Sequence, residues 1–126
     1  MLLQILAYVY LGLAALMFLF FGAILLLAPE KLESWVGVKA TTPQGRTELR
    51  AFYGGLEIGL GLFCVACLQQ PSWFQAGIAG AGWTCAGLAF GRLVGWRIDS
   101  SRNRQQVIYW LVEVTFGVCG ICLSMA

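Results

Sequence analysis

The feature that most constrains this chain is its first apolar run, in which residues 2–27 carry no charged side chain. About 20 helical residues cross the ~30 Å hydrocarbon core of a bilayer, so this run is long enough to span a membrane. It lacks the basic start and the small-residue cleavage site of a signal peptide, and we expect it to stay in place as a helix that ends before Pro29. Three further spans are predicted at about 51–68, 73–95 and 107–124.

These runs predict an all-α, polytopic membrane protein in which residues 1–126 form a single four-transmembrane-helix bundle. Only 11% of the residues are charged, whereas soluble domains carry about 25%, and 60% are hydrophobic. The connection QQPSW between the second and third spans is very short, which makes these two helices antiparallel neighbours.

The basic residues all fall on one side of the predicted bilayer. Following the chain across it places the two long connections on one side, and both termini and the QQPSW turn on the other. Because lysine and arginine near the ends of spans mark the cytoplasmic side, we expect both termini to be periplasmic and the protein to lie in an inner membrane. The bases on the predicted cytoplasmic side are Lys31, Lys39, Arg46, Arg50, Arg92, Arg97, Arg102 and Arg104.

The second and fourth spans share a pattern. Tyr53-x-x-x-Glu57-x-x-x-Gly61 in the second matches Tyr109-x-x-x-Glu113-x-x-x-Gly117 in the fourth. The same residue types at the same spacing indicate a two-helix hairpin used twice, with its copies related by a pseudo-twofold axis along the membrane normal. Chance is the alternative, because glycine is abundant in this chain.

Acids and bases from three spans are predicted to meet in the cytoplasmic half of the bundle. Glu57 and Glu113 each lie about six residues, or ~9 Å, inside the cytoplasmic ends of their spans. An ionised side chain in lipid costs ~2.5–3.5 kcal/mol on insertion scales, so such groups face the bundle interior and pair. One interpretation is a structural lock, in which each glutamate takes one arginine. The other is a pocket that opens to the cytoplasmic leaflet and binds a ligand. The predicted cluster is Arg50, Tyr53, Glu57, Arg92, Tyr109 and Glu113.

Glycines recur at four-residue spacing in the second and third spans. Such stripes of small residues let membrane helices approach closely. Within a four-helix bundle they are more often contacts inside one molecule, although a homo-oligomer stays open. The glycines predicted to allow close packing are Gly54, Gly55, Gly59, Gly61, Gly87 and Gly91.

The block GRTELRAFYGGLEIGLGLF, followed by AFGRLVG and by a glutamate in the last span, resembles the bacterial membrane family catalogued as domain of unknown function 4345. The resemblance covers almost the whole chain. It implies four helices in a layout similar to the DoxX-like proteins, which are linked to quinone or thiol redox systems and to membrane-protein assembly, and it implies no established activity. The positions that carry it are Arg50, Tyr53, Gly54, Gly55, Glu57, Gly91, Arg92 and Glu113.

Five cysteines and no histidine limit the available chemistry. Without histidine the commonest zinc and haem ligand sets are excluded, and we predict no metal. Cys64-x-x-Cys67 and Cys119-x-x-Cys122 resemble the CxxC pairs of quinone-linked thiol oxidoreductases. However, both lie in apolar helix without the cations that activate a thiol, and packing explains them as well.

These observations leave three hypotheses. The favoured one is a small membrane protein whose polar cluster binds a lipid, an amphiphilic ligand or a partner membrane protein, as an accessory subunit. The second is a thiol- or quinone-linked oxidoreductase, in which quinone would be the cofactor; otherwise no cofactor is expected. The third is a purely structural subunit of a larger complex. No phosphate-binding loop, catalytic triad or nucleic-acid surface is present in the sequence, so a non-enzyme is favoured.

Overall fold

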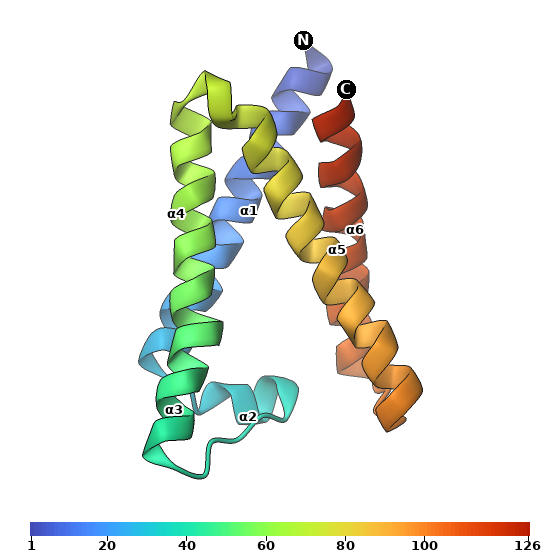
Figure 1. Cartoon of the computed structure of the whole chain (residues 1–126). Helices are drawn as coiled ribbons and strands as arrows, with labels where there is room; N and C mark the ends of the chain where they lie inside the picture. The colour runs from blue at the N-terminus through green and yellow to red at the C-terminus, as the bar shows by residue number, and fades with distance from the viewer. The chain divides into compact units, whose positions relative to one another are not determined.

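The computed structural model describes residues 1–126 and is helical throughout, with no strand. Figure 1 shows the elements in chain order. They are α1 (Leu2–Leu27), α2 (Lys31–Val36), α3 (Pro43–Leu49), a π-helical segment (Arg50–Gly55), α4 (Leu56–Gln69), a short 3₁₀ turn (Pro71–Trp73), α5 (Phe74–Asp99) and α6 (Arg104–Met125). The chain divides into two compact units, which we call the α1/α4 unit (residues 12–66) and the α5/α6 unit (residues 1–11 and 67–126).

Three helices are long and apolar enough to cross a membrane: Leu2–Leu27, the continuous helix Pro43–Gln69, and Arg104–Met125. The fourth predicted span is less clear. Helix α5 has 26 residues, but its glycines and polar side chains, among them Gln75, Thr84 and Arg92, keep it from being as clearly apolar as the other three. The second span also begins earlier than predicted, because α3 and the π-helical segment continue directly into α4.

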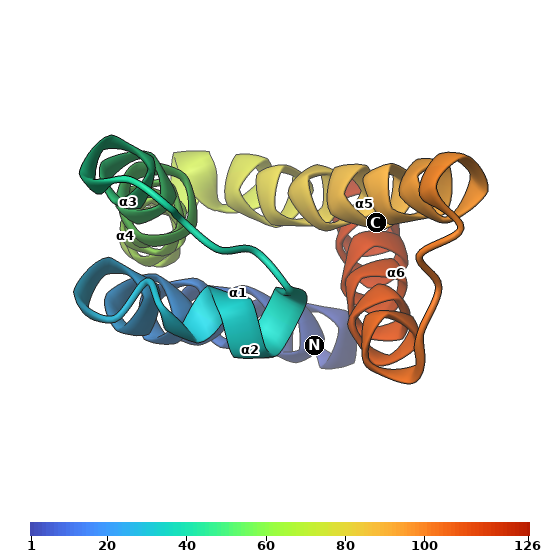
Figure 2. The same cartoon turned by 90° about the horizontal axis from the view of Figure 1, so that it is seen from below.

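The start of the second long helix is fixed by local capping. The side chain of Thr42 accepts a hydrogen bond from the Gly45 backbone N–H at 3.0 Å, and Pro43 occupies the first helical position, where its missing N–H costs nothing. Upstream, α2 ends at Gly37, whose φ of 77° is accessible to glycine. A non-helical link then leads from α2 to α3 (Figure 2).

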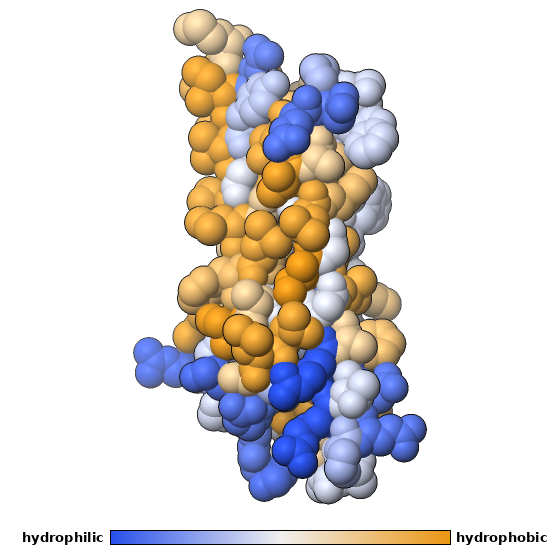
Figure 3. All heavy atoms as spheres, turned by 90° about the vertical axis from the view of Figure 1, so that its left-hand side faces the viewer, coloured by the Kyte–Doolittle hydropathy of each residue, from blue (hydrophilic) through white to orange (hydrophobic).

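Within the α1/α4 unit, α1 packs against the π-helical segment and α4 through glycines. A Cβ at Gly54 would lie 2.7 Å from the Leu26 Cα, and one at Gly61 would lie 3.0 Å from the Leu19 backbone nitrogen. Both glycines therefore permit the close approach that the sequence predicts for them. Figure 3 shows the face to which α3 and α4 belong: apolar side chains cover the middle of the helices, and hydrophilic side chains gather at the end that carries α3.

Within the α5/α6 unit, α5 and α6 pack side by side along much of their length (Figures 1 and 2). A Cβ at Gly82 would lie 2.8 Å from the Ile121 backbone nitrogen, and one at Gly117 would lie 3.0 Å from that of Ala86. The start of α1 joins this pair, because the Tyr10 hydroxyl donates to the Phe116 carbonyl oxygen at 3.0 Å. The beginning of α1 and the second half of α6 therefore lie together.

The two hairpins pack in equivalent registers. Gly61 meets Leu19 in the first hairpin, and its sequence counterpart Gly117 meets Ala86 in the second. Gly22 lies three residues after Leu19 in α1, and Ala89 lies three residues after Ala86 in α5. Gly22 meets Ile58, and Ala89 lines a groove together with the counterpart of Ile58, Val114. The hairpin repeat itself stays a prediction.

Candidate functional site

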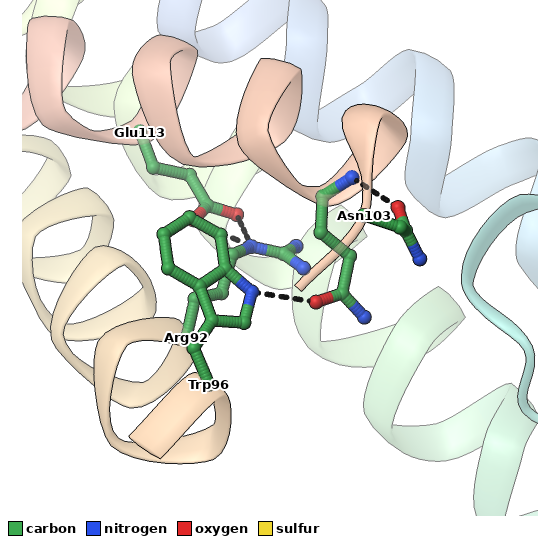
Figure 4. A network of polar contacts seen from close by, with 5 residues as sticks. Arg92, Trp96, Asn103 and Glu113 are labelled. Atoms are coloured by element: carbon green, nitrogen blue, oxygen red, sulfur yellow. Dashed lines mark hydrogen bonds and ion pairs between the residues drawn. The ribbon is translucent and has the colours of Figure 1, made fainter. Parts of the chain in front are cut away.

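The strongest polar contact in the α5/α6 unit joins Arg92 on α5 to Glu113 on α6 (Figure 4). The Arg92 Nε donates to both carboxylate oxygens, at 2.9 and 2.7 Å. The two side chains are only 25% and 13% exposed, respectively. The sequence predicts that an arginine and a glutamate from different spans meet at this depth, and in this unit they form a charge-assisted pair.

Aromatic and amide side chains surround the pair. The Trp96 Nε1 donates to the Gln106 side-chain oxygen at 2.7 Å, which joins the end of α5 to the start of α6 (Figure 4). The Arg92 guanidinium lies 5.3 Å from the centre of the Tyr109 ring, within cation–π range. Asn103 caps α6 by accepting from the Gln106 backbone N–H at 2.9 Å. These contacts hold the guanidinium between two helices whose ends are themselves tied together.

An open groove of about 540 Å³ lies beside Arg92. Its glycines are spaced four residues apart on one face of α5, and its polar side chains come from the end of α5, the following loop and the start of α6. The lining residues are Thr84, Gly87, Leu88, Gly91, Arg92, Gly95, Trp96, Ser101 and Gln106. We call this the Arg92 groove. Towards Trp96 the groove is polar, and towards Gly87 its one polar side chain, Thr84, donates to the Gly80 carbonyl oxygen.

The guanidinium retains hydrogen-bonding capacity. Only Nε is engaged by Glu113, and the two terminal nitrogens of Arg92 donate no hydrogen bond to the protein. Bases also outnumber acids by four to two between residues 92 and 113. One of these bases, Arg102, lies with its guanidinium carbon 5.5 Å from the centre of the Trp96 ring. The groove therefore offers a two-nitrogen fork in net positive surroundings, a geometry that matches carboxylate and phosphate oxygens.

Arg50, Tyr53 and Glu57 belong to the other unit. The structural-lock interpretation pairs each glutamate with one arginine, but Arg50 forms no ion pair: its Nη1 donates to the carbonyl oxygens of Leu26 and Leu27 at the end of α1. Those carbonyls have no partner inside their own helix, so Arg50 acts as a cap for α1. Tyr53 is 37% exposed.

Glu57 is half-buried and makes no hydrogen bond or ion pair. The alignment of the two hairpins explains why Glu57 lacks an arginine partner. Arg92 lies six residues beyond Ala86 in the second hairpin, and the residue six beyond Leu19 in the first hairpin is Leu25. The first hairpin thus has an apolar side chain where the second has the arginine. That Glu57 and Glu113 share one pocket stays a prediction.

The six glycines predicted to allow close packing differ in their surroundings. Gly54 and Gly61 lie against α1, as described above. An added Cβ would meet nothing within 4 Å at Gly59, Gly87 or Gly91, and at Gly55 only the Arg50 carbonyl oxygen at 3.8 Å. In the third span the glycine stripe therefore borders the open Arg92 groove, whereas the seam with α6 uses Gly82, which was not among the predicted glycines.

The cysteine pairs lie in different surroundings. Cys64 and Cys67 are buried, whereas Cys119 and Cys122 are exposed on α6. Cys67 packs closely against Gly77, where an added Cβ would lie 2.9 Å from its sulfur. Packing therefore accounts for Cys67.

Sequence reasoning missed several residues of the Arg92 groove, among them Trp96, Ser101 and Gln106. The sequence pattern around Trp96 gives no sign of its hydrogen bond to Gln106. These residues could have been found from the short connection between α5 and α6, because a loop of only a few residues between two long helices brings the helix ends together.

Comparison with known proteins places the chain in a family without assigning it an activity. The family model described as domain of unknown function (DUF4345) matches residues 6–124. No curated protein and no solved structure matches the chain.

Proposed function

The chain belongs to the family described as domain of unknown function (DUF4345), and we propose that it is a small multi-pass membrane protein that binds an amphiphile with an anionic head group in the Arg92 groove. One observation carries the proposal: the Arg92 guanidinium is held through Nε by Glu113, while its two terminal nitrogens face no protein acceptor. Two terminal guanidinium nitrogens that are held in place and lack an acceptor match the paired oxygens of a phosphate or carboxylate group.

The shape of the groove supports an amphiphile over a small anion. One end holds Arg92, Trp96 and Gln106, and the other is formed by Thr84, Gly87 and Leu88, where the Thr84 hydroxyl donates to the Gly80 carbonyl oxygen. A head group at the guanidinium would leave a hydrocarbon tail running along the glycine face of α5. Such a volume, about 540 Å³, is within the range of about 300–1,000 Å³ that small-molecule sites occupy.

We further propose that the helices form a four-span bundle in a bacterial inner membrane, with both termini periplasmic. The basic residues of the two long connections support this orientation. The packing of the start of α1 against α6 supports placing both termini on one side. In this arrangement the Arg92 groove opens towards the cytoplasmic leaflet, where anionic lipids are available. A role as an accessory subunit of a larger complex fits a binding protein without a catalytic group.

The proposal is tested by lipid binding to the purified full-length protein, measured by native mass spectrometry. Phosphatidylglycerol and phosphatidylcholine with identical chains are offered in equal amounts. The wild-type protein is expected to retain phosphatidylglycerol preferentially. A double variant, Arg92→Gln with Glu113→Gln, removes the fork without leaving a charge unpaired, and it is expected to bind both lipids equally.

Arg104→Gln is the matched control, because it removes an exposed arginine at the first residue of α6, outside the groove. It is expected to keep the preference for phosphatidylglycerol. An equal loss of preference in both variants would mean that diffuse positive charge attracts the lipid. An unchanged preference in the double variant would leave the Arg92–Glu113 pair as a structural lock and end the proposal.

A further inference from the structure

A second groove lies between α5 and α6, and it contains an unusual polar atom. The groove has a volume of about 210 Å³ and shares no lining residue with the Arg92 groove. The Trp110 side chain on α6 lines it, and its Nε1 is the one buried side-chain nitrogen or oxygen in the chain with no hydrogen-bond partner. The lining residues are Ala86, Ala89, Phe90, Leu93, Trp110, Val114, Gly117, Val118 and Ile121.

A buried indole N–H ordinarily has an acceptor, because burying it unpaired costs its hydration. No side chain in this groove supplies one, since apart from Trp110 the lining side chains are all apolar. An ordered water is a poor substitute, because a buried water needs two to four polar partners and the groove offers one. The missing acceptor must therefore enter together with apolar surface.

We propose that this groove holds one acyl chain of a phospholipid, whose ester carbonyl oxygen accepts a hydrogen bond from the Trp110 Nε1. A glycerolipid ester combines the two required properties, an acceptor joined directly to a hydrocarbon chain. The depth of Trp110 suits a lipid ester group, because Trp110 lies six residues, or ~9 Å, along α6 from Arg104. Tryptophan is enriched at that boundary between head groups and hydrocarbon.

The site is independent of the proposed function. The Arg92 groove selects a head group by charge, whereas this groove selects a linkage by hydrogen bonding. Phe90, Leu93 and Val118 would contact the chain. No side chain is common to the two grooves, although the ring centres of Trp96 and Trp110 lie 5.7 Å apart.

The test compares two phosphatidylcholines of identical head group and chain length, one with ester and one with ether linkages. Binding to the full-length protein is measured by native mass spectrometry. Because one neutral hydrogen bond separates the two lipids, the ester form is expected to bind roughly two- to tenfold more tightly. Trp110→Phe removes the N–H and keeps most of the ring, and it is expected to bind both lipids equally.

Trp83→Phe is the matched control, because Trp83 is 62% exposed on α5 and lies outside the groove. It is expected to keep the wild-type preference. Equal binding of the two lipids by the wild-type protein overturns the proposal, even if Trp110→Phe fails to fold. A preference that survives in Trp110→Phe also overturns it, as does a stoichiometric quinone extracted from the purified protein.

Discussion

Replacing Glu113 by glutamine tests whether the Arg92–Glu113 pair is the main polar contact that holds α5 to α6. Glutamine keeps the shape of the side chain and removes its charge, so Arg92 loses the carboxylate that accepts from Nε at 2.9 and 2.7 Å. Breaking a buried pair by removing one partner costs ~3–5 kcal/mol. Because a quarter of the Arg92 side chain is exposed, we expect the lower end, about 3 kcal/mol of unfolding free energy.

The assay is reversible unfolding in mixed micelles, followed by far-ultraviolet circular dichroism. Glu57→Gln is the matched control: it makes the same chemical change in the same repeat position, but Glu57 has no hydrogen bond or ion pair to lose. We expect it to change the unfolding free energy by less than about 1 kcal/mol. Arg92→Met with Glu113→Leu should restore most of the lost stability. An equal loss in the two glutamine variants would refute the assignment and would indicate that Glu57 is paired in the membrane.

Three further predictions follow from packing and exposure. Gly82→Val should destabilise the α5/α6 unit by about 2 kcal/mol or more, because its Cβ would lie 2.8 Å from the Ile121 backbone nitrogen. Gly87→Ala should be neutral or stabilising by up to ~1 kcal/mol, because its Cβ would meet nothing within 4 Å. Thermal unfolding of the two variants compares these effects. A reporter active only in the periplasm should be active when fused after Ala126 and silent between residues 100 and 103; the reverse pattern would invert the topology. Cys119 and Cys122 should be alkylated faster than Cys67 in the folded protein, as mass spectrometry would show, and equal rates would contradict their different burial.

The hydrophobic pattern predicts the long helices well and their ends less well. The first long helix is predicted at 2–27 and forms there, because no charged side chain interrupts it. The second begins eight residues early, since the Thr42 cap and Pro43 start a helix whose first turns are polar. Hydropathy alone detects the apolar part of a helix and overlooks such a capped, polar extension.

The site shows a different limit. The spacing of Glu113 and its depth in the last span predict a buried pair, and the pair with Arg92 forms. The repeat in turn suggests the same role for Glu57. It has none within its own hairpin because Leu25 occupies the position equivalent to Arg92, and the register between antiparallel helices is set by side-chain packing. A pattern within one helix contains no information about that register.

The most direct test of the Arg92 groove is the distance between arginine nitrogens and lipid phosphorus in a bilayer. Solid-state NMR on protein with ¹⁵N-labelled arginine in phosphatidylglycerol membranes can measure ³¹P dephasing separately for Nε and the terminal nitrogens. The account predicts a phosphorus within about 4–5 Å of the Arg92 terminal nitrogens. In the wild-type protein Nε, which is engaged with Glu113, should dephase less than the terminal nitrogens. All Arg92 signals should be lost in Arg92→Lys, which assigns them. A dephasing pattern that Arg92→Lys leaves unchanged would contradict the account.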